Sequence, residues 1–164
     1  MDSGEPFFWM QGILATGLAE VTADVGRIDT VGFWAAVTSF EGETFFARFT
    51  NIQRDAPFPI TESWKSLETL WESTFAQADY EDYVREIRNS IAEGFVYQVN
   101  ACRILTTSAP DISLASLFTK ILEANPSPFA CFLRLPDIEI ASASPELFLR
   151  RDGVHITTSP IKGT

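Results

Sequence analysis

Two side chains near the end of the sequence have the types and spacing for acid–base and nucleophilic chemistry. The carboxylate of Glu146 opens an apolar run, and the amine of Lys162 stands sixteen residues later. A lysine is a nucleophile only after it loses the proton that it holds up to a pKa of about 10.4, and a neighbouring carboxylate can take that proton. The same carboxyl group, when protonated, helps a hydroxyl to leave, which contributes about 100- to 10,000-fold to a rate.

A predicted β-hairpin would bring these two side chains close together. Residues 146–151 and 154–159 have the pattern of two strands, joined by an Asp-Gly turn at residues 151–153. Because a hairpin brings its outer ends together, we expect Glu146 and Lys162 to lie within reach of each other. Spacing alone leaves two interpretations open: a catalytic acid and amine, or an ordinary solvated salt bridge at a sheet edge.

The motifs around this pair resemble those of the chorismate-utilising enzymes. Residues 144–146 (Ser-Pro-Glu) and 160–164 (Pro-Ile-Lys-Gly-Thr) are similar to paired motifs of the aminodeoxychorismate branch of that family. Residues 97–100 (Tyr-Gln-Val-Asn) and 125–129 (Asn-Pro-Ser-Pro-Phe) agree with the same pattern. The resemblance covers about residues 80–164 and favours the catalytic interpretation of the pair.

Lys162 implies a particular reaction within the family, because related anthranilate, isochorismate and salicylate synthases typically carry alanine at this position. By this resemblance, Lys162 attacks C2 of chorismate as the 4-hydroxyl leaves, and Glu146 is the general acid and base. Ammonia from a glutamine amidotransferase subunit then adds at C4 and expels the lysine amine. The product is 4-amino-4-deoxychorismate, on the route to 4-aminobenzoate and folate. The same motif implies Gly163 and Thr164 as substrate-binding residues.

The resemblance also implies Mg²⁺, which would hold the dicarboxylate substrate. Its ligands are expected downstream of Thr164, so no residue of this sequence is expected to bind metal. We therefore expect the 164 residues alone to be inactive. Two alternatives stay open: anthranilate or isochorismate formation by an enzyme of the same family, or an inactive fragment that acts only as an interaction module.

Composition and charge exclude several other classes. Apolar residues make up 46% of the chain, which is typical of a globular protein, and the net charge is −10. The sequence has no basic patch for nucleic acid and no apolar run near the roughly 18 residues that span a membrane. Its first residues are acidic where a secretory signal is basic. We expect a cytoplasmic protein, with Cys102 and Cys131 as free buried thiols.

The elements that must position the pair are both helical and extended. We predict an α+β fold with a largely antiparallel sheet, in one domain over residues 1–164 without an internal boundary. The resemblance implies an anthranilate-synthase-like fold that is incomplete in this sequence. The predicted strands are one within residues 1–30, a hairpin of 32–40 with 43–50, a strand over 95–105 with Gln98 and Asn100 on one face, and 129–134 with 138–144. The predicted helices follow Thr61, span residues 79–94, and begin at Asp111 or Ser113.

Overall fold

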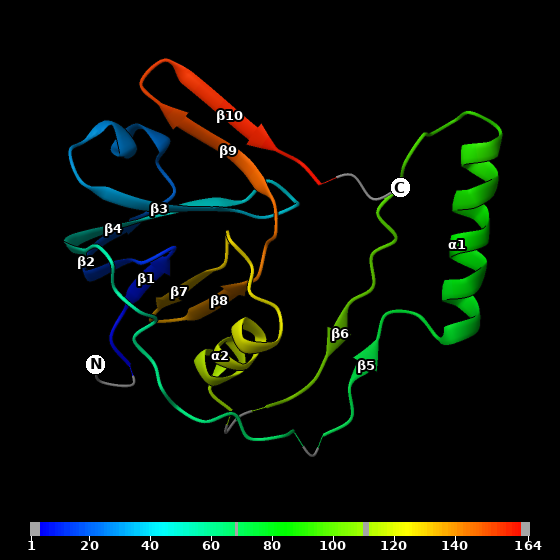
Figure 1. Cartoon of the computed structure of the whole chain (residues 1–164), viewed down its shortest axis with the longest axis horizontal. Coiled ribbons are helices and arrows are strands. Elements are labelled where there is room, and N and C mark those ends of the chain that lie inside the picture. Colours follow the sequence, from blue (N-terminus) through cyan, green and yellow to red (C-terminus); the bar gives the residue numbers. More distant parts are fainter. Residues whose placement is uncertain (1–3, 68, 110–111, 162–164) are drawn as a thin grey trace. The chain divides into compact units, whose positions relative to one another are not determined.

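The computed structural model describes residues 4–67, 69–109 and 112–161 (Figure 1). The chain falls into two compact units: one combines residues up to 65 with those from 113 onward, and the other is residues 66–112. Within these ranges each unit has one α-helix, and the first unit also has the large antiparallel sheet. The α+β class with an antiparallel sheet is thereby confirmed. The interpretation of the chain as one chorismate-binding domain without an internal boundary stays a prediction.

A six-stranded sheet forms the centre of the first unit, in the order β3-β4-β2-β1-β7-β8 (Figure 1). Every pair of neighbours in it is antiparallel. Its strands are β1 (Phe7–Met10), β2 (Ile13–Thr22), β3 (Phe33–Thr38), β4 (Thr44–Gln53), β7 (Cys131–Leu135) and β8 (Ile138–Ser142). Because β1 pairs with both β2 and β7, the N-terminal strands and the segment that leads to Glu146 belong to one sheet.

Strand β2 was not predicted from the sequence, because only one strand was expected within residues 1–30. It contains Gly17, whose φ of +69° is unusual for a strand. A Cβ at this glycine would lie 2.5 Å from Thr50 Oγ1, so the site requires glycine for close contact with β4. The pairing with β4 shifts between Leu18 and Glu20, which is a β-bulge. The glycines that interrupt a helical pattern therefore mark an irregular strand here.

The two faces of the sheet bury separate apolar clusters, as the alternation of strand side chains requires. Phe7 and Phe132 lie in one cluster, and Leu133 lies in the other. Helix α2 (Leu114–Ala124) packs on the first cluster through the fully buried Phe118, whose ring centre is 5.5 Å from that of Phe132. Burial of such a side chain contributes about 1.5–3 kcal/mol, so these rings hold the helix against β7.

Both confirmed helices show recognisable ends. Helix α2 begins after Ser113, whose hydroxyl accepts a hydrogen bond from the backbone N–H of Ser116 at 3.4 Å. Helix α1 (Gln77–Ala92) begins two residues before the predicted Asp79 cap, because Ala76 takes the capping position. Gly94, with a φ of +80°, ends α1 as predicted. A short 3-10 helix, η1 (Val25–Asp29), follows β2.

Two predicted elements are wrong. The helix after Thr61 is absent: the described residues between Thr61 and α1 are irregular apart from β5 (Glu72–Ser73), which pairs with β6 (Leu105–Thr106). The strand over 95–105 is likewise absent up to Leu105. The hydroxyls of Thr69 and Thr107 are hydrogen bonded at 2.8 Å, so these distant segments are paired laterally, and this pairing overrides the helical spacing. In the described ranges, neither helix is long and apolar enough to cross a membrane.

Candidate active site

The hairpin that carries the candidate residues is present. Strands β9 (Leu147–Asp152) and β10 (His155–Ser159) pair in an antiparallel manner, which confirms the two predicted strands to within one residue at each end. The turn itself consists of Gly153 and Val154, one position later than expected. Gly153 has a φ of +58° at the first central position, where a two-residue turn of type II′ favours glycine.

The strand register brings the open end of the hairpin together. Thr157 pairs with Arg150, but Ser159 pairs with Leu147, so β9 contains an extra residue at a β-bulge. Thr158 Oγ1 also donates a hydrogen bond to the carbonyl oxygen of Leu147 at 3.3 Å. Glu146 directly precedes Leu147, and Pro160 directly follows Ser159. Glu146 is therefore beside the segment that leads to Lys162.

Lys162, Gly163 and Thr164 lie outside the described residues. The approach of the Lys162 amine to the Glu146 carboxylate, the catalytic roles of this pair and the substrate-binding roles of Gly163 and Thr164 therefore stay predictions. The described part of the hairpin ends at the exposed Ile161.

Glu146 has an exposed side chain on a main chain that is held locally. Its backbone N–H donates to Ser144 Oγ at 3.2 Å, and Ser144 Oγ donates to the backbone oxygen of Glu146 at 3.1 Å. Its carboxylate makes no hydrogen bond or ion pair to any residue that the structure describes. The carboxylate is thus accessible to water and to a ligand while its backbone is fixed.

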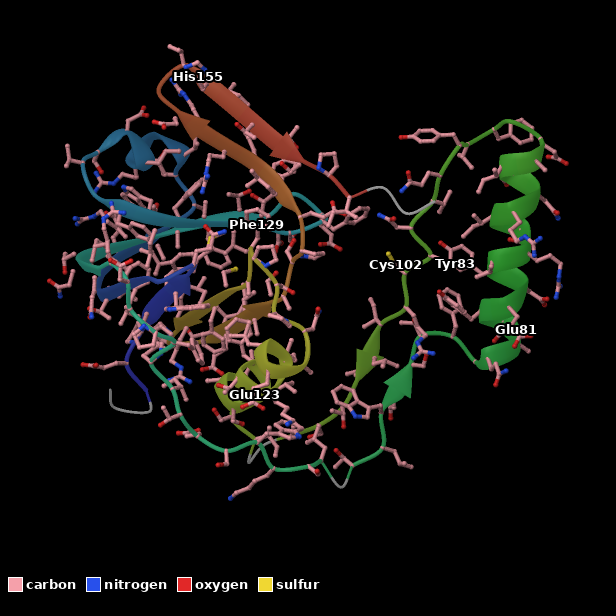
Figure 2. The ribbon with its side chains drawn as sticks, in the orientation of Figure 1. Glu81, Tyr83, Cys102, Glu123, Phe129 and His155 are labelled. Carbon is pink, nitrogen blue, oxygen red and sulfur yellow. The ribbon has the colours of Figure 1, made fainter. Side chains whose placement is uncertain are left out.

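A second motif segment is joined to this one. The backbone N–H of Phe129 donates to the carbonyl oxygen of Ser144 at 3.2 Å, which connects the loop after α2 with the residues before β9. Figure 2 labels Phe129 on that loop. The same loop lines a pocket of about 290 Å³ together with Trp9 and Gln11. Gln11 Nε2 donates to the carbonyl oxygen of Pro128 at 2.5 Å, so the turn between β1 and β2 also supports the loop.

The histidine, the two amide side chains and the two cysteines are the remaining side chains of interest. His155 is exposed at the turn end of the hairpin, opposite the end that carries Glu146 (Figure 2). Gln98 and Asn100 are exposed on irregular backbone in the unit of residues 66–112, so they do not share a strand face. Both cysteines are free, but Cys102 is exposed instead of buried, and burial raises the pKa of the partly buried Cys131 thiol.

A metal site does not arise from the described residues, because no three His, Cys, Asp or Glu side chains among them are grouped to hold an ion.

The sequence motif included Ser144, but it did not reveal the hydrogen bonds of the Ser144 hydroxyl to Glu146. A signal for them was present, because a serine hydroxyl commonly bonds the backbone of the residue two positions later in a turn.

Comparisons with known proteins agree with the motifs. The chain matches the family described as chorismate binding enzyme over residues 38–164, more than half of its length. It is 38% identical over 100 residues to the aminodeoxychorismate synthase component 1 of Escherichia coli, and the match covers 60% of this chain and 22% of that protein. It is 34% identical over 97 residues to an anthranilate synthase component 1 of Haloarcula marismortui, with coverage of 59% and 19%. The chain thus matches about a fifth of the length of these relatives. No solved structure matches it.

Proposed function

The chain belongs to the chorismate binding enzyme family, and from this premise we propose that its protein aminates chorismate at C4 to form 4-amino-4-deoxychorismate. Lys162 is the nucleophile and Glu146 the general acid and base. The observation that carries the proposal is the register of the hairpin, since the pairing of Ser159 with Leu147 puts Glu146 beside the segment that leads to Lys162.

The reaction proceeds in two displacements. The neutral Lys162 amine forms a bond to C2, both double bonds of the ring diene shift by one position, and the 4-hydroxyl leaves as water with a proton from Glu146. Ammonia then bonds to C4, both double bonds shift back, and the C2–N bond breaks to release the neutral Lys162 amine. Glu146, now ionised, takes up the proton that ammonia releases. The sum is chorismate plus ammonia giving 4-amino-4-deoxychorismate plus water, and one carboxyl group near one amine serves both steps.

Partner and metal belong to the same proposal. A glutamine amidotransferase subunit supplies the ammonia, and Gly163 and Thr164 bind the substrate beside Lys162. Mg²⁺, when bound, would neutralise carboxylate charge on chorismate through oxygen ligands. The family resemblance supports ligands for it downstream of Thr164, and this assignment is part of the proposal.

Anthranilate formation is the second candidate function, because relatives named anthranilate synthase match this chain at 34% and 32% identity. Lys162 favours amination at C4 over this alternative, since the resembling anthranilate synthases typically carry alanine there. Chromatographic identification of the product from chorismate and ammonium separates the two reactions.

Mass spectrometry of the full-length protein tests the nucleophile. Incubation with chorismate in the absence of ammonia should give an adduct on the peptide that contains Lys162, and Lys162→Ala should remove both the adduct and at least about 100-fold of the amination rate. Lys120→Ala is the matched control, because Lys120 is an exposed lysine on α2 paired only with Glu123 among the described residues. An unchanged amination rate in Lys162→Ala would contradict the proposed role.

A further inference from the structure

The hydroxyl of Ser144 forms hydrogen bonds with both the backbone N–H and the backbone carbonyl oxygen of Glu146. It accepts a hydrogen bond from the Glu146 N–H at 3.2 Å and donates one to the Glu146 carbonyl oxygen at 3.1 Å. A serine hydroxyl has one proton to donate and lone pairs to accept with, so one side chain fills both roles. These bonds restrict rotation of the two peptide units on either side of the Glu146 Cα.

Ser144 is itself held in place. Its carbonyl oxygen accepts from the Phe129 N–H at 3.2 Å, and its residue is partly buried. Pro145 follows directly, which locks its own φ and keeps Ser144 in an extended conformation. The serine is therefore a fixed support for the glutamate that follows it.

The chain is also fixed on the other side of Glu146. Leu147 pairs with Ser159 across the hairpin, and its carbonyl oxygen accepts from Thr158 Oγ1 at 3.3 Å. Glu146 thus lies between two anchored residues, with an exposed side chain and a constrained Cα.

We propose that Ser144 is a positioning residue for Glu146: its hydroxyl fixes the backbone from which the catalytic carboxyl group projects. This inference rests on the proposed function, in which Glu146 transfers the proton. Proton transfer and displacement depend steeply on geometry, and a shift of about 1 Å at a reacting group lowers a rate on the order of 100-fold. In this proposal Ser144 acts on the chemical step through Glu146.

Steady-state kinetics of three variants of the full-length protein test this role. Ser144→Ala should lower kcat for amination about 10- to 100-fold with little change in KM for chorismate. Ser144→Thr keeps the hydroxyl and should restore most of kcat. Ser142→Ala, which removes a hydroxyl two residues earlier that is hydrogen bonded to Cys131, should leave both constants unchanged. A kcat within about twofold of wild type in Ser144→Ala, or an equal loss in Ser142→Ala, would overturn the inference.

Amide hydrogen exchange separates failure of this inference from failure of the proposed function. Loss of one hydrogen bond of about 1 kcal/mol should speed exchange of the Glu146 amide about fivefold in Ser144→Ala and leave it unchanged in Ser142→Ala. If wild-type protein forms a different product from chorismate, the proposed reaction is wrong and the kinetic comparison applies to that product. If wild-type protein forms no product, the exchange experiment still decides about the hydrogen bond between Ser144 and Glu146. Unchanged exchange of the Glu146 amide in Ser144→Ala would overturn that bond, and faster exchange would confirm it.

Discussion

Glu146, the proposed general acid, combines an exposed carboxylate with a constrained backbone. Its carboxylate makes no bond to the described residues, whereas its backbone N–H and carbonyl oxygen are both bonded to Ser144 Oγ. A general acid must exchange protons with its surroundings, and its position must still be defined. In the role proposed for Glu146, a constraint on the main chain meets both requirements, because it leaves the carboxylate oxygens available to a substrate.

The thiol of Cys131 should react slowly compared with that of Cys102. Cys131 is partly buried, and this burial raises the pKa of its thiol, while Cys102 is exposed. Because the thiolate is the reactive form, we expect iodoacetamide to alkylate Cys131 at least about tenfold more slowly than Cys102 near neutral pH. Mass spectrometry of the two tryptic peptides over time measures both rates. The difference should vanish in denaturant, and equal rates in the native protein would be inconsistent with the burial of Cys131.

At the scale of elements, an ion cluster joins the bulged strand β2 to its neighbours. Glu20 of β2 forms salt bridges with Arg27 of η1 at 2.9 Å and with Arg48 of β4 at 3.6 Å. The hydrogen bond from Arg27 is the main reason that the pKa of Glu20 is below its ordinary value. The pairing holds η1 against the irregular part of β2, where the sheet register shifts.

This cluster predicts a pH dependence of stability. A lowered pKa in the folded state means that the unfolded chain binds the Glu20 proton more readily. The contribution of Glu20 is therefore present above the unfolded value of 4.5 and is lost as the pH falls through the folded pKa. We expect Glu20→Gln to lower Tm at pH 6, and the difference from wild type to shrink towards pH 3.5.

Thermal unfolding over this pH range measures the effect. Glu43→Gln is the control, because Glu43 is exposed and forms no ion pair in the part of the chain that the structure describes. A Tm difference between Glu20→Gln and wild type that stays constant with pH would show that the cluster contributes through packing alone.

At the scale of the whole molecule, the two units differ in how much they bury. Among the described residues, the fully buried aromatic rings all belong to the unit with the six-stranded sheet, and Phe7, Phe49 and Phe118 are three of them. In the unit of residues 66–112, none of the described positions is buried. Helix α1 keeps its aromatic contact between Tyr80 and Tyr83, and Tyr80 donates a hydrogen bond to the carbonyl oxygen of Ala101 at 3.0 Å.

This difference predicts unequal local stability. Since buried apolar contacts determine the free energy of local opening, amides of α1 should exchange hydrogen at least about 100-fold faster than those of β7. Hydrogen exchange followed by mass spectrometry compares peptides from the two elements in one experiment. Similar protection of α1 and β7 in the chain of 164 residues would mean that α1 is covered by contacts other than those described.

The sequence by itself determined the parts of this protein whose order is local. Alternation and the glycine at position 153 predicted the hairpin of β9 and β10, Gly94 predicted the end of α1, and the motif with Glu146 and Lys162 indicated the family. These features depend on residues that are close together in the chain. A short stretch of sequence therefore contains the information that predicts them.

Only the tertiary structure decided the features that depend on distant partners. The helix expected after Thr61 gave way to pairing with residues near Thr107, and β2 formed because β1 and β4 flank it. The bulge that puts Glu146 beside Pro160, and the bond from Phe129 that fixes Ser144, are likewise set by pairing between separate segments. Local propensity differs between conformations by at most about 1 kcal/mol per ordinary residue, so contacts between distant segments determine the outcome.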